Sequence, residues 1–478
     1  MSNTTTTAAA RPHATSTTTT TTLQAAEIAA RLDRLPATRT IWMMVILLSL
    51  GGFFEFYELF ATAYIAPGIV RSGLLSTTTA TLFGATGLAG FIAANFAGLF
   101  VGTCIFGFVA DYLGRRSVFT IALLWYSAAS ALMALQDSAG GLLLCRFLVG
   151  VGLGLELVTI DAYLSEMVPS KVRGRAFALN QMIQFIAVPT VALLGWLLVP
   201  IAPFGIDGWR WVSLIGALGA LPVWWIRKHL PESPRWLAAH GHTAKAQEIV
   251  TAIEQRVTAD YGQPLPPVAV SLPETAPERG GFRELWSRKY APRTVMLVLF
   301  HIFQTVGLYG FVHWAPTFLV QRGIPLTASL GYTLTIAFVA PFGPALAMRY
   351  ADSIERKWQI VWSALAVALA GLVFGHAQTP ALIVASGIVE TLAAAILAFN
   401  FHAYQAELYP TRIRAMAIGF VYSWSRLSGA ASGFLIAYVM RKNGVEGAFV
   451  LIAACMGMVM LAVAILGPKT SGRQLESI

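Results

Sequence analysis

Charged side chains are scarce in this sequence. Asp, Glu, Lys and Arg make up 12% of its 478 residues, hydrophobic residues make up 56%, and the mean hydropathy is +0.65. Soluble globular proteins carry about 25% charged residues, so a chain of this composition cannot cover its apolar surface in water. The composition excludes a disordered chain and a coiled coil, and it indicates that lipid is the solvent.

Cysteine and catalytic motifs are also nearly absent. The three cysteines, Cys104, Cys145 and Cys455, lie far apart in apolar segments, which excludes a disulfide framework and a paired-cysteine metal or redox site. The sequence contains no HExxH, no GxxxxGK followed by Ser or Thr, no GxSxG and no GxGxxG after a strand. We therefore expect that the protein is not an enzyme and that it uses no cofactor and no metal. The energy for any transport would then come from a gradient across the membrane.

Long apolar runs fill most of the remaining sequence. Each can form a helix across a hydrocarbon core of ~30 Å, and lipid requires helices because it cannot satisfy free backbone groups. The predicted fold is an all-α membrane protein with twelve transmembrane helices in two six-helix halves. The predicted spans are 41–66, 84–109, 117–136, 142–164, 176–199, 209–227, 292–320, 329–348, 358–376, 381–405, 415–440 and 446–466.

Polar segments flank and divide these spans. Residues 1–40 are rich in Thr and Ala, lack the apolar core of a signal peptide, and are predicted to be a disordered cytoplasmic tail. Residues 228–291 are predicted to be a cytoplasmic linker with short helices, and residues 467–478 a second cytoplasmic tail. The N-terminal half then comprises residues 41–227 and the C-terminal half residues 292–466.

The net charge of +10 reflects orientation in a membrane. Most of the 33 lysines and arginines fall in the segments that lie on the same side as the N-terminus, and few, such as Arg71 and Arg322, fall on the other side. This positive-inside pattern predicts that both termini are cytoplasmic and that the chain resides in the cell (inner or plasma) membrane. It also argues against a role in binding nucleic acid.

A charged motif follows the second span and reads Gly107-Phe-Val-Ala-Asp111-Tyr-Leu-Gly114-Arg115-Arg116. Glycine permits close helix approach and a tight turn, and Asp111 can pair with an arginine. The same residues could instead form a basic loop that only sets orientation. The motif resembles the GxxxDxxGRR signature of the major facilitator superfamily, and the division into six plus six spans agrees with that resemblance.

Further segments resemble the sugar-porter branch of that superfamily: residues 146–154 and 163–175, the PESPRWL segment from Pro231 to Leu237, and residues 352–357 and 407–414, which repeat the pattern in the second half. The resemblance covers about residues 41–470 and implies parallel repeats that alternate access to a site near mid-membrane. It also implies a cytoplasmic gate made of Asp111, Arg115, Arg116, Glu166, Arg173, Arg175, Asp352, Arg356, Glu407 and Arg412.

Spans 7 and 10 depart from the sugar-porter pattern. Phe303 replaces the first residue of a Gln-Gln pair and leaves Gln304, His313-Trp314 replaces an aromatic pair, and His402 replaces a Trp. In these positions the sequence is more similar to the metabolite–proton symporters for small organic acids, a group that includes aromatic-acid and nicotinate carriers and synaptic-vesicle-type proteins.

Ionisable residues inside the spans are costly and are therefore functional candidates. Glu55 and Glu58 lie one turn apart on the first span, and two carboxylates this close do not both ionise easily. The resemblance aligns Glu58 with the acidic residue of proton-coupled sugar porters and Arg146 with its arginine partner. A static buried ion pair is the alternative. The proton-coupling candidates are Glu55, Glu58 and Arg146.

Arg426 in span 11 is the leading substrate-binding candidate, because a guanidinium can grip a carboxylate through two parallel bonds. The alternative is a structural pair with Glu390. Interhelical hydrogen bonds are as good an explanation for most of the other polar candidates. The remaining substrate-binding candidates are Gln184, His301, Gln304, His313, Trp314, Asn400, His402 and Trp424. Glu156 and Asp161 in span 4 fit either a proton route or bridges to the gate.

These observations predict a secondary active transporter that imports a small organic acid, with aromatic carboxylates among the candidates, together with a proton. Protonation of Glu58 would cancel its charge and release it from Arg146. The first and fourth spans could then separate, which would permit the substrate site to change the side of the membrane that it faces. A sugar or polyol proton symporter and a drug or metabolite antiporter are the alternatives, and a sensor that retains the fold is a third. The expected partners are the small-molecule substrate, a proton and the lipid bilayer, with no nucleic acid, and the expected state is a monomer.

Overall fold

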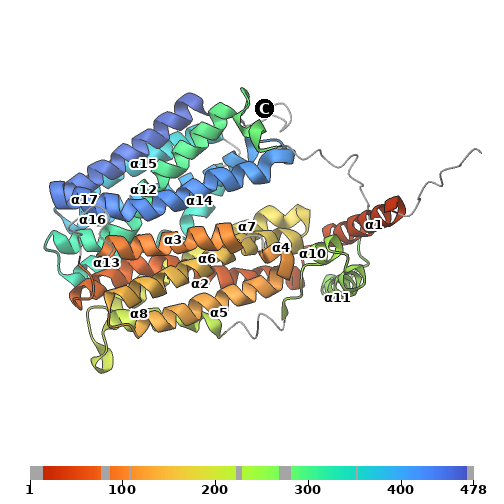
Figure 1. The fold of residues 1–478 in the computed structure, drawn as a ribbon, viewed down its shortest axis with the longest axis horizontal. Coiled ribbons are helices and arrows are strands. Elements are labelled where there is room, and N and C mark those ends of the chain that lie inside the picture. The colour runs from red at the N-terminus through yellow and green to blue at the C-terminus, as the bar shows by residue number, and fades with distance from the viewer. Residues whose placement is uncertain are drawn as a thin grey trace, which may run out of the picture.

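The computed structural model describes residues 14–76, 87–106, 109–221, 225, 229–268, 281–350 and 354–470. Within these ranges every regular element is a helix, and the strand-like pairing is limited to an isolated bridge between Ser76 and Gly87. Nine of the described helices are long and apolar enough to cross a membrane. Figure 1 shows two bundles of roughly parallel helices, the N-terminal half below and the C-terminal half above. The predicted all-α membrane fold is confirmed.

The helices of the N-terminal half follow the predicted spans. They are α2 (Arg39–Arg71), α3 (Leu88–Phe106), α5 (Arg115–Ala134), α6 (Ala139–Met167), α7 (Arg173–Leu198) and α8 (Gly208–Ala217), which continues into η3 (Leu218–Ala220). Short elements connect them: α4 (Val109–Leu113), η1 (Ser170–Val172) and η2 (Pro203–Gly205). Pro189 lies inside α7 without ending it.

The C-terminal half differs from its predicted spans at two places. Its helices are α12 (Ala291–Gln321), α13 (Leu326–Ala337), α14 (Phe342–Tyr350), α15 (Arg356–His376), α16 (Pro380–Glu407) and α17 (Thr411–Leu466). The predicted span 329–348 is two helices, and Pro341, which has no backbone N–H, lies between them. The two predicted spans 415–440 and 446–466 both lie in α17, which is interrupted at Gly444 by a positive φ of 69°.

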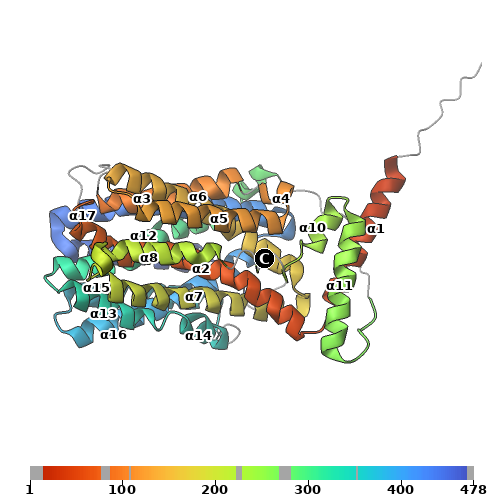
Figure 2. The same cartoon turned by 90° about the horizontal axis from the view of Figure 1, so that it is seen from below.

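The prediction of a disordered tail over residues 1–40 is wrong for its described part. Residues Ala14–Asp33 form helix α1, and Ile28, Leu32 and Leu35 are fully buried. Helix α1 lies against α10 (Pro234–Ala239) and α11 (Thr243–Tyr261) of the linker, as Figure 2 shows. The prediction rested on the Thr-rich composition and overlooked that the apolar residues of this segment recur at the spacing of an amphipathic helix. Residues 1–13 lie outside the described part.

Ion pairs fix α1 to the linker in an arrangement that we call the clasp, formed by α1, α10 and α11. The carboxylate of Glu254 on α11 forms ion pairs with two arginines: its Oε2 atom lies 2.6 Å from Nη2 of Arg31, and its Oε1 atom lies 2.7 Å from Nη2 of Arg34. Asp33 forms an ion pair with Arg235 at 2.9 Å and accepts a hydrogen bond from the backbone N–H of Ser170 at 2.8 Å. The clasp is therefore joined to the α6–α7 connection, and it belongs to the N-terminal half.

A glycine seam brings α3 and α6 into backbone contact. Gly98 and Gly102 on α3 face Gly150 and Gly154 on α6, four residues apart on each helix. A Cβ atom at Gly98 would lie 2.1 Å from the carbonyl oxygen of Phe147, which no side chain can tolerate. Small residues at this spacing are the usual means of close helix packing in membranes, where burial from water does not drive association.

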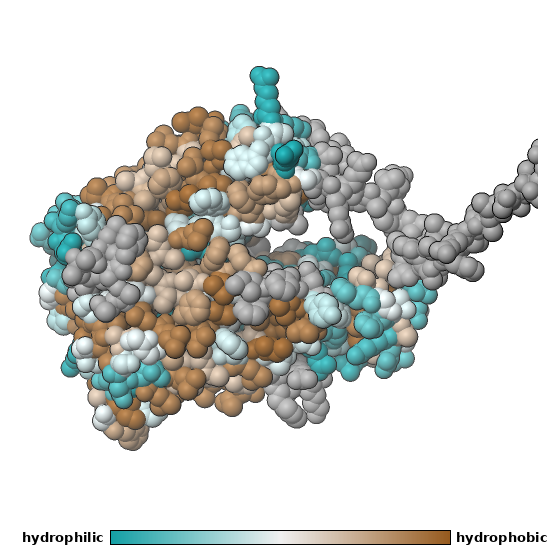
Figure 3. Space-filling view, viewed as in Figure 1, coloured by the Kyte–Doolittle hydropathy of each residue, from teal (hydrophilic) through white to brown (hydrophobic). Residues whose placement is uncertain are grey.

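The two halves touch each other at the end of the bundle far from the clasp. Gly433 on α17 lies against Ala89 on α3, and Gly331 on α13 lies against Trp196 near the end of α7. Toward the clasp, Figure 3 shows a hollow between the halves. The molecule is closed at one end and open at the other, as a single state of an alternating-access cycle requires.

The clasp is expected to loosen in acid. Burial disfavours the Glu254 carboxylate, but the hydrogen bonds and charges of Arg31 and Arg34 outweigh burial and lower its pKa below the ordinary 4.5. A lowered folded-state pKa means that the stabilisation is complete above the ordinary value and is lost as pH falls through the lowered one. Hydrogen exchange of α1, corrected for intrinsic rates, should stay constant from about pH 8 to 5 and rise below about pH 4.

The variant Glu254→Gln should produce the same loosening at neutral pH, by about 1–2 kcal/mol, because both arginines lose their ionic partner. Glu248→Gln on the exposed face of the same helix is the matched control and should leave α1 protection unchanged. Equal protection of α1 in Glu254→Gln and the native protein would show that the ion pairs do not hold the clasp.

Candidate functional site

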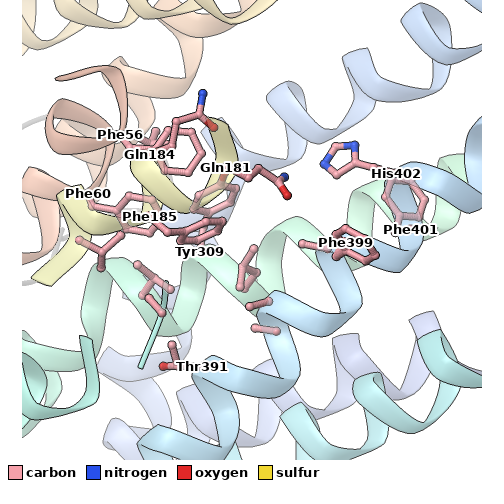
Figure 4. A pocket seen from close by; sticks show the side chains of 18 of the residues that line it. Phe56, Phe60, Gln181, Gln184, Phe185, Tyr309, Thr391, Phe399, Phe401 and His402 are labelled. Atoms are coloured by element: carbon pink, nitrogen blue, oxygen red, sulfur yellow. The ribbon is translucent and has the colours of Figure 1, made fainter. Parts of the chain in front are cut away.

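A cavity of about 740 Å³ lies between the two halves. The N-terminal half contributes α2, α6 and α7 to its wall, and the C-terminal half contributes α12, α13, α16 and α17. Figure 4 shows aromatic side chains around it, with Phe56, Phe60 and Phe185 near Tyr309 and with Phe399 farther along α16. A volume and lining of this kind suit a small molecule with an apolar or aromatic body.

Arg426 is the only arginine or lysine among the described residues that line the cavity. Its side chain is 4% exposed, and its Nε atom has no hydrogen-bond partner within the described ranges. The guanidinium carbon lies 4.8 Å from the ring centroid of Tyr422, and Tyr309 lies within interaction range of the same group. No ion pair joins Arg426 to Glu390 in the described part of the chain, so the structural pair weighed above does not form in this state.

Acidic side chains are more numerous than cations at the cavity wall. Glu55 on α2, Asp161 on α6 and Glu390 on α16 all line it. Both carboxylate oxygens of Glu55, one of Glu390 and both of the adjacent Glu156 are buried without a hydrogen-bond partner among the described residues. An ionised carboxylate held in this way is costly, because low-dielectric surroundings neither solvate nor pair it.

The structure brings Glu58 and Arg146 together outside the cavity lining. The Nη1 atom of Arg146 lies 3.5 Å from Oε2 of Glu58, and its Nη2 atom donates to the backbone oxygen of Glu58 at 2.8 Å and to the Thr62 hydroxyl. Ser130 on α5 donates to Oε1 of Glu58 at 2.7 Å. Both charged side chains are at most 1% exposed, so this is a fully desolvated ion pair.

Glu55 and Glu58 share a helix but have different surroundings. Glu55 lines the cavity, and the charged groups that act on it are Glu156, Asp161 and Arg426. Glu58 is turned toward Arg146 and Ser130. The two carboxylates therefore do not share one site, as their spacing on the helix had predicted. They form two separate acidic sites, with Glu55 at the cavity and Glu58 behind the cavity wall.

The other predicted substrate-binding residues divide into two groups. Gln184, His301, Gln304 and His402 line the cavity, as expected. Four others lie outside its lining. His313 stacks on Tyr309 with ring centroids 5.3 Å apart, Trp314 stacks on Phe318, and Asn400 donates to the backbone oxygen of Ile396. Trp424 is half-buried on α17, away from the cavity.

Several cavity residues were not singled out by the sequence. Tyr309, Tyr422, Phe56, Phe60 and Phe185 line the cavity, but aromatic residues on apolar helices are equally common on packing and lipid-facing surfaces. Hydropathy does not distinguish these surfaces. The useful signal is the position of Tyr309, two turns along α12 from His301 and one turn from His313, on a face that already carries polar residues.

The predicted gate residues form ion pairs within each half. Arg115 meets Glu166 at 3.1 Å, the backbone N–H of Arg116 donates to Glu232, and Arg356 pairs with Glu407. Arg173 lies 3.8 Å from Asp33 of the clasp, and Arg175 is exposed. The Asp111 and Arg412 side chains and all of Asp352 lie outside the described residues. No ion pair of the described residues joins the two halves at this end, which agrees with an open cavity there.

Two six-helix halves around a cavity that opens at one end in the described part of the chain define a secondary transporter of the alternating-access type. The sequence comparison agrees: the family described as sugar (and other) transporter matches residues 44–478. The chain belongs to this family of the major facilitator superfamily, as the sequence predicted, and it is a multi-pass protein of the cell membrane.

Several relatives match along almost their whole length. YyaJ of Bacillus subtilis, named for metabolite transport, is 31% identical over 450 residues, which cover 94% of this chain and 96% of that protein. The niacin transporter NiaP of Acinetobacter baylyi is 28% identical and covers 95% of this chain and 99% of its own. The Escherichia coli inner membrane metabolite transport protein YdjE matches with the same identity and coverage.

Solved structures show the same fold at lower identity. The xylose transporter XylE of Escherichia coli, in a partially occluded inward open conformation, has a TM-score of 0.73 at 17% identity and covers 91% of this chain and 99% of its own. A bacterial homologue of the human lysosomal transporter Spinster, inward-facing and unoccupied, has a TM-score of 0.62 at 17% identity and covers 90% and 97%. The relatives are transporters, which supports a transport role over an enzymatic one.

The hydrogen bond from Ser130 to Glu58 offers a test of the buried ion pair. Ser130→Ala should lower thermal stability by about 1–3 kcal/mol, because a buried carboxylate oxygen loses its donor. Ser127→Ala, one turn away on α5, is the control, since that hydroxyl is buried without a partner among the described residues and its removal should be neutral or stabilising. Melting curves in detergent or nanodiscs measure both, and equal shifts would contradict the assigned hydrogen bond.

Proposed function

We propose that this protein is a proton-coupled symporter of a small organic acid, with an aromatic carboxylate as the preferred substrate. The observation that carries the proposal is Arg426, a buried guanidinium at the cavity wall without an ionic partner among the described residues and packed against the Tyr422 ring. A planar guanidinium can bind a carboxylate through two parallel hydrogen bonds, and the neighbouring rings can stack on an aromatic body.

The excess of acidic groups supports proton coupling. An anion that enters beside Glu55, Asp161 and Glu390 meets more negative than positive charge, since Arg426 is the one arginine or lysine in the described lining. At a separation of 4 Å, like charges repel by about 4 kcal/mol at an effective dielectric of 20. Protonation of the carboxylates removes this repulsion, so an organic anion and protons would enter the site more favourably together than apart.

The comparisons support the same substrate class. The relatives matched over most of their length include a niacin transporter of Acinetobacter baylyi at 28% identity and a protein of Bacillus subtilis named as a niacin/nicotinamide transporter at 26% identity. Niacin is a small aromatic carboxylate, which agrees in size and charge with a cavity that combines an arginine with aromatic rings.

A sugar or polyol is the second candidate, and a specific set of residues favours it. Asn180, Gln181, Gln184 and Gln304 line the cavity and supply the amide donors and acceptors that hydroxyl groups need. The structural neighbours include a proton symporter of D-xylose with a TM-score of 0.70 and 20% identity, which shows the shared fold alone. A drug or metabolite antiporter, favoured by the aromatic lining, is the third candidate.

In the proposed cycle, Glu58 and Arg146 form the proton-sensitive pair and Arg426 holds the substrate. Protonation of Glu58 from the side opposite the clasp would neutralise a partner of Arg146 and loosen α2 from α6. The gate ion pairs within each half would rearrange as the clasp end closes. Symport requires only that the two halves reorient when substrate and proton are both bound or both absent.

The role of Arg426 is tested by ligand binding. Arg426→Gln should weaken binding of benzoate or nicotinate by about 100-fold, because the charge-assisted hydrogen bonds are lost, and Arg426→Lys should restore only part of the affinity because an ammonium lacks the planar fork. Binding is measured by thermal shift and calorimetry, with xylose as the sugar probe. Stabilisation by xylose and not by the carboxylates would support the sugar alternative.

The role of Glu58 is tested by separating exchange from accumulation. In proteoliposomes, Glu58→Gln should abolish substrate accumulation driven by a pH gradient and retain counterflow exchange, because the neutral side chain mimics a permanently protonated carrier. Radiolabelled nicotinate or benzoate provides the measurement, and Glu248→Gln is the surface control. Accumulation by Glu58→Gln at the native level would exclude Glu58 as the coupling group.

A further inference from the structure

Glu390 on α16 is a buried acid at the cavity wall, in the same half as Arg426. The residue is 1% exposed, its Oε1 atom has no hydrogen-bond partner among the described residues, and its Oε2 atom accepts from the Thr391 hydroxyl at 3.5 Å. A buried carboxyl group with an unsatisfied oxygen is costly in the empty protein, whether it carries a proton or a charge. The cavity side of Glu390 is therefore a site that a ligand group can complete.

Glu390 and Arg426 lie at different levels of the cavity. His402, which is also on α16, lies within electrostatic range of Arg426. Glu390 precedes His402 by twelve residues on this helix, a rise of about 18 Å. Figure 4 shows Thr391, the neighbour of Glu390, well apart from His402, with Phe399 between them along α16. The carboxyl group and the guanidinium are thus separated along the cavity, and aromatic lining lies between them.

The part of the wall near Glu390 is small and apolar. Helix α13 packs on α16 one turn before Glu390, where Gly387 meets the side chain of Ile336. One turn after Glu390, Ala394 continues the cavity lining on the same face of the helix. These side chains leave the carboxyl group accessible from the cavity and add no polar group of their own.

We propose that Glu390 binds a basic nitrogen of the substrate while Arg426 binds its carboxylate, so that the preferred substrates are aromatic acids that carry an amine at the opposite end. This inference rests on the proposed function and narrows its substrate class from organic acids to amphoteric ones. Glu390 then determines specificity at one end of the cavity, as Arg426 does at the other.

The pairing of Glu390 with an amine does not depend on which partner holds the proton. A carboxylate accepts N–H bonds from an ammonium group, and a carboxylic acid donates its O–H to a neutral amine. Both arrangements contain the same atoms and the same proton, and both give the unsatisfied Oε1 atom a partner. An alkyl group at the same place leaves that oxygen unsatisfied and removes it further from water.

An amphoteric substrate also suits the composition of the cavity wall. The carboxyl groups of Glu55, Asp161 and Glu390 outnumber the one guanidinium in the described lining. A simple organic anion brings another negative group, whereas an anion with an amine brings a group that pairs with an acid. Glu55 and Asp161 lie in mutual electrostatic range, and Arg426 acts on Glu55 as well. An amine held away from the guanidinium, along α16, meets Glu390 instead.

The test compares ligands that differ only in an amine. The purified full-length protein is titrated by calorimetry with para-(aminomethyl)-, para-(aminoethyl)- and para-(aminopropyl)benzoate, and each is matched with para-ethyl-, para-propyl- or para-butylbenzoate, in which a methyl group replaces the amine. At the best of the three lengths, the amine should bind about 10- to 100-fold more tightly than its alkyl counterpart, because it gains a charge-assisted hydrogen bond.

Variants assign each end of the ligand to a residue. Glu390→Gln should lose the preference for the amine and bind the alkylbenzoates with native affinity, which also shows that the variant is folded. Arg426→Gln should weaken both members of each pair. Glu390→Asp keeps the carboxyl group but is shorter by a methylene, so its preference should remain and move to the next longer amine. Glu248→Gln on the exposed face of α11 is the control and should behave as the native protein.

Two results would overturn the inference. Equal affinity of the native protein for amine and alkyl ligands at all three lengths would show that no site for a basic nitrogen exists. A preference that persists in Glu390→Gln would place that site elsewhere. If Glu390→Gln does not fold, Glu390→Asp decides, since an unchanged optimal length in that variant contradicts contact between Glu390 and the amine.

The outcome for the proposed function is read separately. If the alkylbenzoates bind through Arg426 and the amines gain nothing, the inference fails while an organic-acid substrate stands. If no carboxylate binds and xylose does, the proposed function fails. In that case para-methylbenzylamine, which has no carboxylate, isolates the Glu390 site: binding that is lost in Glu390→Gln supports the site, and absence of binding overturns it.

Discussion

The structure depends on a single constraint, the high free energy of an unpaired charge in a membrane interior. The Glu58–Arg146 pair meets that constraint with close contacts inside one half: the guanidinium and a serine hydroxyl contact the desolvated carboxylate, and a threonine hydroxyl accepts a hydrogen bond from the guanidinium. Glu55, Glu156 and Glu390 do not meet it within the described residues. A buried carboxylate without a partner is stabilised by a proton, by a bound ligand or by a rearrangement of its surroundings, and two of these carboxylates, Glu55 and Glu390, line the same cavity.

The contacts within the N-terminal half differ in kind from the contacts between the two halves. Within the N-terminal half, the glycine seam between α3 and α6 brings backbones together, and the clasp fastens α1, α10 and α11 to the connection between α6 and α7. Between the halves, the described contacts include small residues and rings, such as Gly433 against Ala89 and Phe96 against Tyr309. Apolar surfaces of this kind can separate without stranding charges, which suits an interface that must open and close.

Some of the site was predictable and some was not. Glu55, Glu58, Arg146 and Arg426 were singled out because an ionisable residue in an apolar span is conspicuous in any sequence. His313, Trp314, Asn400 and Trp424 were chosen as polar or aromatic residues in apolar spans, yet they lie outside the cavity lining because the direction of a side chain depends on how its helix is rotated in the bundle. Tyr309 and Tyr422 were not predicted to line the cavity, because nothing in the sequence distinguishes an aromatic residue at a binding site from one that packs against another helix or faces lipid.

The linear sequence by itself determined that lipid surrounds the chain and that its spans are helices. It also determined the division into six plus six spans and the family, because hydropathy, length and loop motifs are local properties that tertiary contacts do not alter. It misjudged residues 14–40, since a helix with a modest apolar face becomes stable only when α10 and α11 cover that face. Only the tertiary structure decided which carboxylate faces the cavity and which faces an arginine of its own half. That choice depends on helix rotation and on distances between residues far apart in the chain, and electrostatic interaction depends on those distances.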